Sequence, residues 1–308
     1  MIRLGVVNID VSHPKAFAEY LQTDNRARYA AVYNAGFLEP DEVEGFCKRF
    51  GVEKICGSVE ELADFTDLGM IQGCNWDKHL EYAKPFLDRG KPVFIDKPMV
   101  GNLEDCRKLQ NLTAQGHVLL GSSSARYCYE IQEFLKQPQK ILHASATVGM
   151  DEFNYAIHAV EGLGGLMGTG AQSVTFSGCA NVDGQRCETY FIQFHDGKTA
   201  CYHSVVDCYM PFHFSVLTTT GHSAFTVDNN RLYGALLDRI CDFMEGKGNH
   251  LAPVESLLES IKIMLAGKAS KENGGIQVPL ERLADYSVSF DGNAFEKAYR
   301  AAAKKIYL

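Results

Sequence analysis

The sequence predicts an α/β protein with two domains: a doubly wound parallel sheet, then an α+β domain whose open sheet is mostly antiparallel. Three observations support this. Short apolar runs alternate with longer helical patterns over roughly the first 120 residues. Beyond Arg126, strand-like runs follow one another directly. The 308 residues also exceed the length at which one hydrophobic core usually divides. We place the boundary after residue 123, giving a Rossmann-like domain over 1–123 and an α+β domain over 124–308.

Buried strands are predicted in the first domain wherever a short apolar run occurs. These runs are residues 2–7, 29–33, 69–73, 92–95 and 117–120. Helical periodicity lies between them, at 14–21, about 40–50 and 78–87. Ser58 and Glu61 have the spacing of a capping box, and Asn102 is expected to open another helix. Strands that alternate with helices form βαβ units, so the carboxyl ends of the strands are the expected ligand side.

The second domain shows a run of strands and then two helices. The strands are expected at 141–147, 173–176, 189–194, 199–206, 212–218 and 223–227. Residues 195–198, His-Asp-Gly-Lys, predict a hairpin turn, because Asp-Gly supplies the positive φ that such turns need. The helices are expected at about 231–245 and 254–269.

Composition narrows the functional classes. With 46% hydrophobic and 22% charged residues the chain is typical of a globular protein, and no run approaches the roughly 20 apolar residues of a membrane helix.

The start of the chain runs into a strand rather than a secretory signal, and the ten cysteines are scattered without a Cys-x-x-Cys pair. We therefore expect reduced thiols and a cytoplasmic location. The net charge of −8, with no basic cluster larger than a pair, argues against a nucleic-acid partner.

The first strand-to-helix turn is where a dinucleotide fingerprint, Gly-x-Gly-x-x-Gly, would lie. This chain has Asn8, Asp10 and His13 at the glycine positions. Asn tolerates the left-handed backbone conformation, but Asp10 adds bulk and a negative charge beside a diphosphate. At about 4 Å such repulsion costs roughly 1 kcal/mol in water and about 4 kcal/mol near a protein surface. Asp10 or Ser12 is instead expected to cap the first helix, with Pro14 in its first turn. Cofactor binding then requires a loop with a different path.

Two further positions bear on a cofactor or substrate. Asn34 ends the second strand, where an acidic residue usually binds the ribose, and its amide leaves NAD or NADP open. Lys97 follows the strand at 92–95 and stands between Asp96 and Pro98. A lysine at the carboxyl end of a parallel strand points into the ligand crevice, where it can bind a hydroxyl or carry a proton. The alternative is a surface lysine paired with Asp96.

Residues 95–98, Ile-Asp-Lys-Pro, resemble the Glu-Lys-Pro motif of the Gfo/Idh/MocA oxidoreductases, which include glucose-fructose oxidoreductase and inositol dehydrogenase. Residues 75–83 resemble that family's Asn-x-x-His-x-x-x-Ala segment, and residues 89–93 resemble its Gly-Lys-x-Val approach to the lysine strand. Residues 122–126 resemble its segment ending in Arg at the domain junction. Residues 269–275 with Val278 resemble its closing Ala-x-x-Ser-x-x-x-Gly pattern. The resemblance covers nearly the whole chain.

The resemblance implies a nicotinamide cofactor, NAD or NADP, on the first domain and hydride transfer to or from a sugar, polyol or related hydroxy compound. Lys97 matches the motif lysine, and His158 matches the histidine of an Asp/His pair whose Asp position is Asn154. We expect this pair on one face of a helix at 154–161, where Glu161 would replace the missing carboxylate. A lone helical histidine such as His158 is otherwise most often a core residue. The residues expected to bind the cofactor are Asn8, Ile9, Asp10, Ser12, His13, Asn34, Asn75, Trp76, His79, Asp96, Lys97 and Arg126.

Two rival functions remain open. The first is a ligand-binding or regulatory protein on the same fold, because several fingerprint positions are replaced. The second is a metal-assisted hydrolase or lyase, although no metal is expected from the spacing; its ligands would be His203, Asp207, His213 and His222 with His158 and Glu161. A polyol pocket would be lined by Tyr127, Tyr155, Tyr202 and His203. We expect a homodimer or homotetramer formed through the sheet of the second domain.

Overall fold

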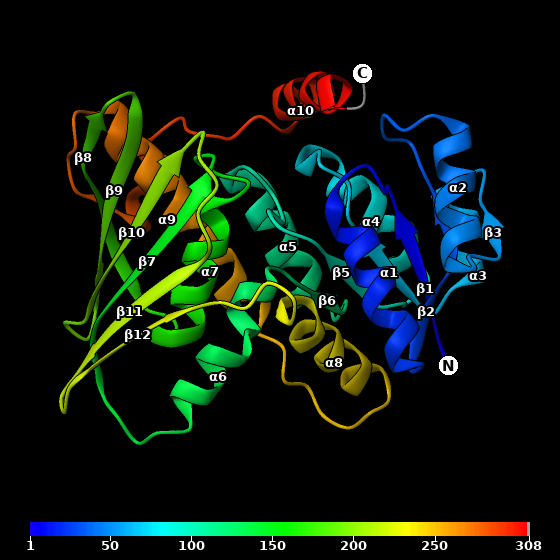
Figure 1. Ribbon diagram of the computed structural model, residues 1–308, viewed down its shortest axis with the longest axis horizontal. Helices are drawn as coiled ribbons and strands as arrows, with labels where there is room; N and C mark the ends of the chain where they lie inside the picture. Colours follow the sequence, from blue (N-terminus) through cyan, green and yellow to red (C-terminus); the bar gives the residue numbers. More distant parts are fainter. Residues whose placement is uncertain (307–308) are drawn as a thin grey trace. The chain divides into compact units, whose positions relative to one another are not determined.

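The computed structural model describes residues 1–306, with side chains for residues 1–303 (Figure 1). The chain forms two compact units. Unit 1 contains Met1–Ser122, Leu237–Val254 and Asp291–Leu308, and unit 2 contains Ser123–Leu236 and Glu255–Phe290. This division differs from the single boundary expected from the sequence, because two later segments return to unit 1.

Unit 1 is built on a six-stranded sheet in the order β3-β2-β1-β4-β5-β6, in which every pair is parallel. The strands are β1 (Ile2–Val7), β2 (Ala27–Tyr33), β3 (Lys54–Ile55), β4 (Leu68–Ile71), β5 (Val93–Ile95) and β6 (Leu119–Leu120). The direction of winding reverses between β1 and β4, which makes the edge beyond their carboxyl ends the switch point of the fold. The predicted doubly wound sheet is confirmed.

Helices of unit 1 follow the strands. They are α1 (Ser12–Asp24), α2 (Pro40–Phe50), α3 (Val59–Phe65), η1 (Trp76–Lys78), α4 (His79–Leu87), α5 (Leu103–Ala114), the part of α8 (Leu232–Met244) from Leu237 onward, and α10 (Gly292–Ile306). Between them the strands bury side chains such as Val6, Val32, Met70 and Phe94, each fully inaccessible. Neither α10 nor the short strand β3 was predicted.

The predicted helix caps had mixed outcomes. The Ser58 hydroxyl accepts a hydrogen bond from the Glu61 backbone N–H at 3.2 Å, and the Asn102 side chain caps α5, so both predictions are confirmed. The first helix differs. Its N-cap is Val11, with no side-chain cap, so the prediction that Asp10 or Ser12 caps it is wrong. The Asp10 carboxylate accepts hydrogen bonds from the next loop instead.

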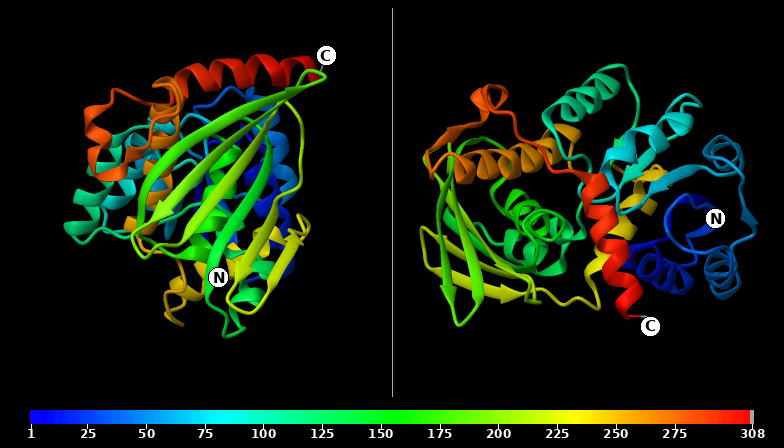
Figure 2. Two further views of the ribbon diagram at one scale, coloured as in Figure 1. Left: turned by 90° about the vertical axis from the view of Figure 1, so that its left-hand side faces the viewer. Right: turned by 90° about the horizontal axis from the view of Figure 1, so that it is seen from above.

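Unit 2 contains a seven-stranded sheet in the order β12-β11-β7-β10-β9-β8-β13, shown face-on at the left of Figure 2. Its strands are β7 (Ile141–Met150), β8 (Ala171–Val182), β9 (Gln185–Phe194), β10 (Thr199–Val206), β11 (His213–Thr218), β12 (His222–Thr226) and β13 (Val278–Pro279). All pairs are antiparallel except β7 with β10. The mostly antiparallel sheet is therefore confirmed, and so is the hairpin at 195–198, where Gly197 has a φ of 84°.

Helices cover one face of this sheet. The helices of unit 2 are η2 (Ser124–Tyr127), α6 (Tyr129–Leu135), α7 (Ala156–Met167), α9 (Val254–Glu272) and η3 (Leu280–Asp285), with the start of α8. A Cβ on Gly162 of α7 would lie 2.2 Å from the Phe214 ring, and one on Gly267 of α9 would lie 2.9 Å from the Tyr202 hydroxyl. Both helices therefore pack closely on the inner face of the sheet. No helix in the described part of the chain is long and apolar enough to span a membrane.

Candidate functional site

The turn after β1 has the backbone conformation that a glycine would otherwise supply. Asn8 has a φ of 61°, which confirms that Asn is tolerated at this position. Its side-chain oxygen accepts from the Ala35 N–H at 2.8 Å, and the Asn34 side-chain oxygen accepts from the Ile9 N–H at 3.2 Å. These two amides hold the loops after β1 and β2 together at the switch point.

Asp10 points into the space between three loops. Its carboxylate accepts from the Cys74 backbone N–H at 3.3 Å, and the Cys74 thiol lies 3.6 Å away. A Cβ on Gly36 would lie 2.3 Å from Asp10 Oδ2, so the carboxylate abuts the loop after β2 as well. Burial raises the pKa of Asp10 to about 6, against hydrogen bonds that lower it. Asp10, Cys74 and Glu296 of α10 have side-chain ligand atoms within 4.8 Å of one another.

Lys97 lies at the carboxyl end of β5, above a buried contact. Asp96 Oδ2 lies 2.6 Å from His13 Nδ1, and Asp96 Oδ1 accepts from the Lys97 backbone N–H at 2.7 Å. Burial by itself would raise the pKa of Asp96, but the charges of His13 and Lys97 and their hydrogen bonds outweigh it, and the pKa lies below its usual value. The Lys97–Pro98 peptide is cis. Both carboxylate oxygens of Asp96 are therefore engaged, and the half-buried Lys97 is fixed at its backbone.

The loop after β4 carries Asn75, Trp76 and His79, and none of these faces open space. His79 is 1% exposed, and its ring nitrogens lie 2.9 Å from the Gly73 carbonyl and 3.0 Å from the Met99 carbonyl. Burial lowers the pKa of His79, so the neutral ring donates to only one of the two carbonyls. His79 therefore positions two loops. Trp76 is 3% exposed, and its ring packs on Phe295 of α10, with the ring centroids 4.9 Å apart.

His158 belongs to unit 2, near the start of α7. Its Nδ1 lies 2.6 Å from the Ser123 hydroxyl, and its ring contacts those of Phe212 and Tyr155, with centroids 4.8 and 5.8 Å away. Asn154 lies in the turn before α7, where its amide donates to Asp151 at 3.4 Å. The prediction that Asn154 and His158 share a helix face is therefore wrong, because the helix begins only at Ala156.

Glu161 and Arg126 form a separate buried pair. Arg126 Nε lies 2.5 Å from Glu161 Oε2, and the guanidinium also donates to the hydroxyls of Ser256 and Ser260 at 3.0 and 3.1 Å. Burial raises the pKa of Glu161, although the charge of Arg126 opposes the rise. One expectation is corrected here, because Glu161 pairs with Arg126 rather than replacing a carboxylate beside His158. Arg126, expected from the sequence to bind the cofactor, is engaged in this buried pair within unit 2.

The remaining sequence expectations concern β10. Successive side chains of a strand point to opposite faces, so Tyr202 lies on the inner face, stacked on Tyr190 at 4.6 Å, while His203 lies on the outer face. These two residues do not line one polyol pocket as expected. His203 Nδ1 lies 3.0 Å from the Thr189 hydroxyl. Among the described side chains, the group able to hold a metal is Asp10, Cys74 and Glu296, not the histidine-rich set.

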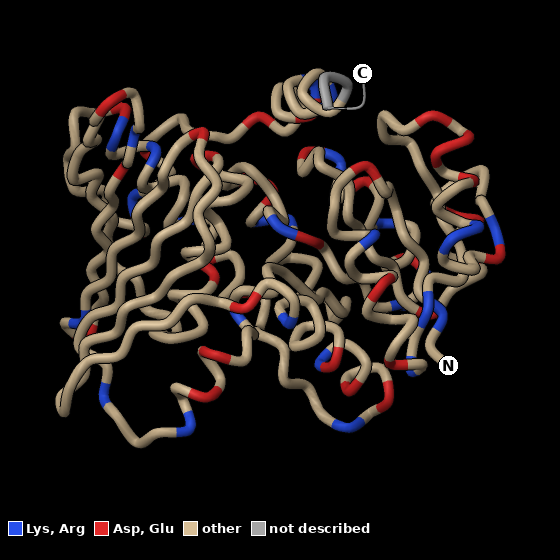
Figure 3. The backbone as a smooth tube through the Cα atoms, viewed as in Figure 1, with Lys and Arg blue, Asp and Glu red and all other residues tan. Residues whose placement is uncertain are grey.

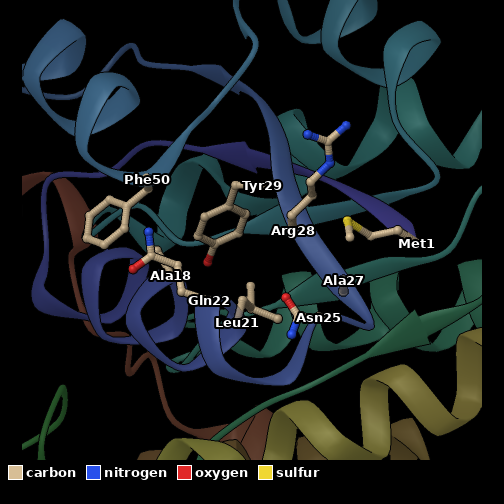
Figure 4. A pocket seen from close by; sticks show the side chains of 9 residues that line it. All are labelled: Met1, Ala18, Leu21, Gln22, Asn25, Ala27, Arg28, Tyr29 and Phe50. Carbon is tan, nitrogen blue, oxygen red and sulfur yellow. The ribbon is translucent and has the colours of Figure 1, made fainter.

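A separate pocket of about 200 Å³ lies at the amino-terminal edge of the unit 1 sheet (Figure 4). Met1, Leu21, Ala27 and Phe50 provide much of its lining. Arg28 is its one charged lining residue, and its guanidinium is paired with Glu53. This pocket lacks the acid–base groups of a catalytic site and lies away from the carboxyl ends of the strands.

The sequence of the first domain is similar to those of known oxidoreductases. The sequence model of an oxidoreductase family with an NAD-binding Rossmann fold, Gfo/Idh/MocA, matches residues 2–123. A 1-carboxy-3-chloro-3,4-dihydroxycyclohexa-1,5-diene dehydrogenase from Comamonas testosteroni is 30% identical over 115 residues, 37% of this chain and 28% of the relative. An uncharacterized oxidoreductase from Streptococcus pneumoniae is 27% identical over 120 residues, 38% of this chain and 30% of the relative. The chain thus matches less than a third of the length of either protein.

Solved structures extend the likeness to the whole fold. A probable dehydrogenase from Thermotoga maritima has a TM-score of 0.76 at 17% identity and covers 92% of this chain and 100% of its own. A scyllo-inositol dehydrogenase from Lactobacillus casei, with bound NAD(H) and scyllo-inositol, has a TM-score of 0.72 at 16% identity and covers 91% and 99%. These TM-scores show a shared fold. By sequence, residues 2–123 are similar to the Gfo/Idh/MocA family of oxidoreductases.

Proposed function

We propose that the protein is an NAD(P)-dependent dehydrogenase that acts on a CH–OH group of a sugar, polyol or related hydroxy compound. The observation that carries this proposal is Lys97 at the carboxyl end of β5, held at its backbone by Asp96, which in turn pairs with His13. The family of the N-terminal domain and the fold shared with a scyllo-inositol dehydrogenase support the class of reaction and of substrate.

The residues at the switch point fit a dinucleotide in part. The left-handed backbone of Asn8 provides the tight turn, and Asn34 provides an amide at the ribose position without the charge that would exclude a 2′-phosphate. The carboxylates of Asp10 and Glu296 do not fit, because they place negative charge where a diphosphate would lie. When bound, the nicotinamide would accept or supply a hydride. Because of the two carboxylates, the arrangement described here does not accommodate it without a change.

Three residues receive proposed chemical roles. Lys97 Nζ binds the substrate hydroxyl and takes its proton. His158 acts as a second acid–base or orienting group, with Nδ1 engaged by Ser123. Asn154 cannot ionise, so its proposed part is to orient the substrate through its amide.

The outer face of the unit 2 sheet is the proposed interface of a homodimer or homotetramer. On this face, alternate residues of the central strands are small or aromatic, and they are uncharged apart from histidine. Examples are Ser145, Thr147, Phe191, Cys201 and His203. Figure 3 shows charged residues sparsely placed along these strands. An uncharged sheet face buries well against its own copy. No disulfide joins the ten cysteines, all of which lie within the described residues; this supports a reducing compartment, and we propose the cytoplasm.

Turnover and binding measurements together test the proposed function. Calorimetric titration with NAD⁺, NADH, NADP⁺ and NADPH identifies the cofactor, and a panel of sugars and polyols is then screened for turnover. Lys97→Met is expected to abolish turnover while the circular-dichroism spectrum stays unchanged. Lys108→Met, on the exposed face of α5, is the matched control and should retain full activity.

Two results would count against the proposal. Wild-type turnover in Lys97→Met removes the assigned role of that lysine. A lack of binding for all four nucleotides, in the wild-type protein and in the α10 variants Gly292→Ala and Phe295→Ala, favours the rival function, a ligand-binding protein that has lost redox activity. The observation that favours this rival is the pair of carboxylates, Asp10 and Glu296, at the switch point.

A further inference from the structure

Helix α10, the last element of the described residues, packs within unit 1 on the loops that follow β1, β2 and β4 (Figure 1). A different residue of α10 contacts each of these three loops. Glu296 reaches Asp10 after β1, Tyr299 packs on Phe37 after β2 at 6.1 Å, and Phe295 packs on Trp76 after β4 at 4.9 Å. The helix therefore covers the point where the winding of the sheet reverses.

Polar contacts fasten the beginning of α10 to the loop after β4. Asp77 Oδ2 accepts from the backbone N–H groups of Gly292 and Asn293, at 2.9 and 3.2 Å, and so caps a helix more than two hundred residues away in sequence. The Asn75 amide donates to Asn293 Oδ1 at 3.0 Å and to Glu296 Oε2 at 2.8 Å. These contacts join Asn75, a residue of the proposed cofactor site, and its neighbour Asp77 to α10.

Close approach at this contact requires glycine. A Cβ on Gly292 would lie 2.6 Å from Asn75 Oδ1 and 2.9 Å from the backbone nitrogen of Asp77. The second of these neighbours is backbone and cannot simply rotate away. The absence of a side chain at position 292 therefore permits the docked position of α10.

A dinucleotide and α10 compete for the same place. In doubly wound folds a dinucleotide lies outside the carboxyl ends of the strands at the switch point, with its diphosphate beside the turn after the first strand. Here that turn carries the Asp10 carboxylate, and α10 adds the Glu296 carboxylate within 4.8 Å of it. The charge repels a diphosphate, and the helix covers the loops that would contact the nucleotide.

We propose that α10 is a strap that closes the dinucleotide crevice, and that it must leave the loops after β1, β2 and β4 before a nicotinamide dinucleotide can bind. This inference rests on the proposed function, because it concerns the cofactor of that reaction. Closing and binding exclude each other, so the apparent affinity for the cofactor equals the intrinsic affinity scaled by the fraction of molecules with α10 released. Any change that undocks α10 tightens cofactor binding.

Trp76, the single tryptophan of the chain, reports directly on the strap, because it is buried against Phe295 of α10. Cofactor binding to the full-length wild-type protein should change the Trp76 emission as Phe295 leaves. Gly292→Ala disturbs the docking contact without removing apolar surface. We expect this variant to bind the preferred dinucleotide about tenfold more tightly, with Trp76 emission already shifted before cofactor is added.

Gly45→Ala is the matched control, because Gly45 lies within helix α2 and a Cβ there meets no atom within 4 Å. It should leave affinity and emission at wild-type values. Phe295→Ala is a second releasing variant that does not depend on the effect at position 292, and its expected affinity gain is similar. Affinities are measured by calorimetry, and folding by circular dichroism.

The outcomes separate this inference from the proposed function. If wild-type protein, Gly292→Ala and Phe295→Ala all bind the dinucleotide with equal affinity, the strap is overturned and the proposed function stands. If a releasing variant binds more weakly than wild type, α10 helps to hold the cofactor and the strap is again overturned. If no protein binds any of the four dinucleotides, the proposed function fails and the strap fails with it.

Discussion

The ring of His13 and the carboxylate of Asp96 meet in the core of unit 1, with Nδ1 2.6 Å from Oδ2. This contact joins helix α1 to the segment that follows β5 and contains Lys97. Both side chains are nearly inaccessible, so water cannot replace either partner. A position expected from the sequence to hold a fingerprint glycine thus supports the backbone of the proposed catalytic lysine.

His13→Ala should lower the free energy of unfolding by about 3 kcal/mol at pH 7, because it leaves the buried Asp96 carboxylate without its main partner. Urea unfolding followed by circular dichroism measures the change. His117→Ala, at a partly exposed position before β6, is the control and should cost less than about 0.5 kcal/mol. A loss below about 1 kcal/mol in His13→Ala would show that the contact contributes little.

Asp10→Asn should stabilise the protein at neutral pH but not in acid. Burial raises the pKa of Asp10 from its usual 3.8 to about 6, so the folded state holds the proton more tightly than the unfolded state. Stability therefore falls as pH rises through this window, by about 3 kcal/mol for this group, and Asn removes the penalty. The gain, measured as the difference between variant and wild type, should be present at pH 8 and absent near pH 3.5. Equal effects at both pH values would contradict this assignment.

The Arg126–Glu161 pair predicts strong non-additivity. Arg126→Met should destabilise the protein by about 3–5 kcal/mol, since it leaves a buried carboxylate unpaired. Adding Glu161→Gln should recover part of that loss, because the second change removes the unpaired charge. Thermal or urea unfolding of the two single variants and the double variant tests this. Simple addition of the two losses would show that the residues act independently.

Asn8 offers a test of backbone conformation. Asn8→Gly keeps access to a φ of 61° but loses the hydrogen bond to the Ala35 N–H, while Asn8→Ala loses the hydrogen bond and also adopts a strained backbone. We expect Asn8→Ala to be less stable than Asn8→Gly by about 1–2 kcal/mol. The comparison uses the two variants alone, so the shared loss of the amide cancels. Equal stabilities would mean that the turn adopts another conformation in the variants.

Local sequence patterns were sufficient for most of unit 1. The apolar runs became β1, β2, β4, β5 and β6, and Ser58 and Asn102 cap helices as expected, because strand burial and helix capping depend on residues only a few positions apart. The short β3 was missed, since two residues carry no periodicity. The β8–β9 hairpin was predicted too short, because polar residues on its outer face hide the strand pattern through the Asp183–Gly184 turn.

Only the tertiary structure decided the surroundings of the candidate site. Three pairs of residues that are more than two hundred positions apart in sequence contact one another: Asp77 with Gly292, Asn75 with Glu296, and Trp76 with Phe295. No local sequence pattern predicts such pairs, because they depend on how the folded elements pack against one another. The sequence by itself determined the alternation of strands and helices and the place of Lys97 at a strand end, because both follow from local periodicity. It also carries the motifs by which the first domain resembles the Gfo/Idh/MocA oxidoreductases. That Asp10 faces Cys74 rather than capping α1, and that α10 closes over it, was decided by packing.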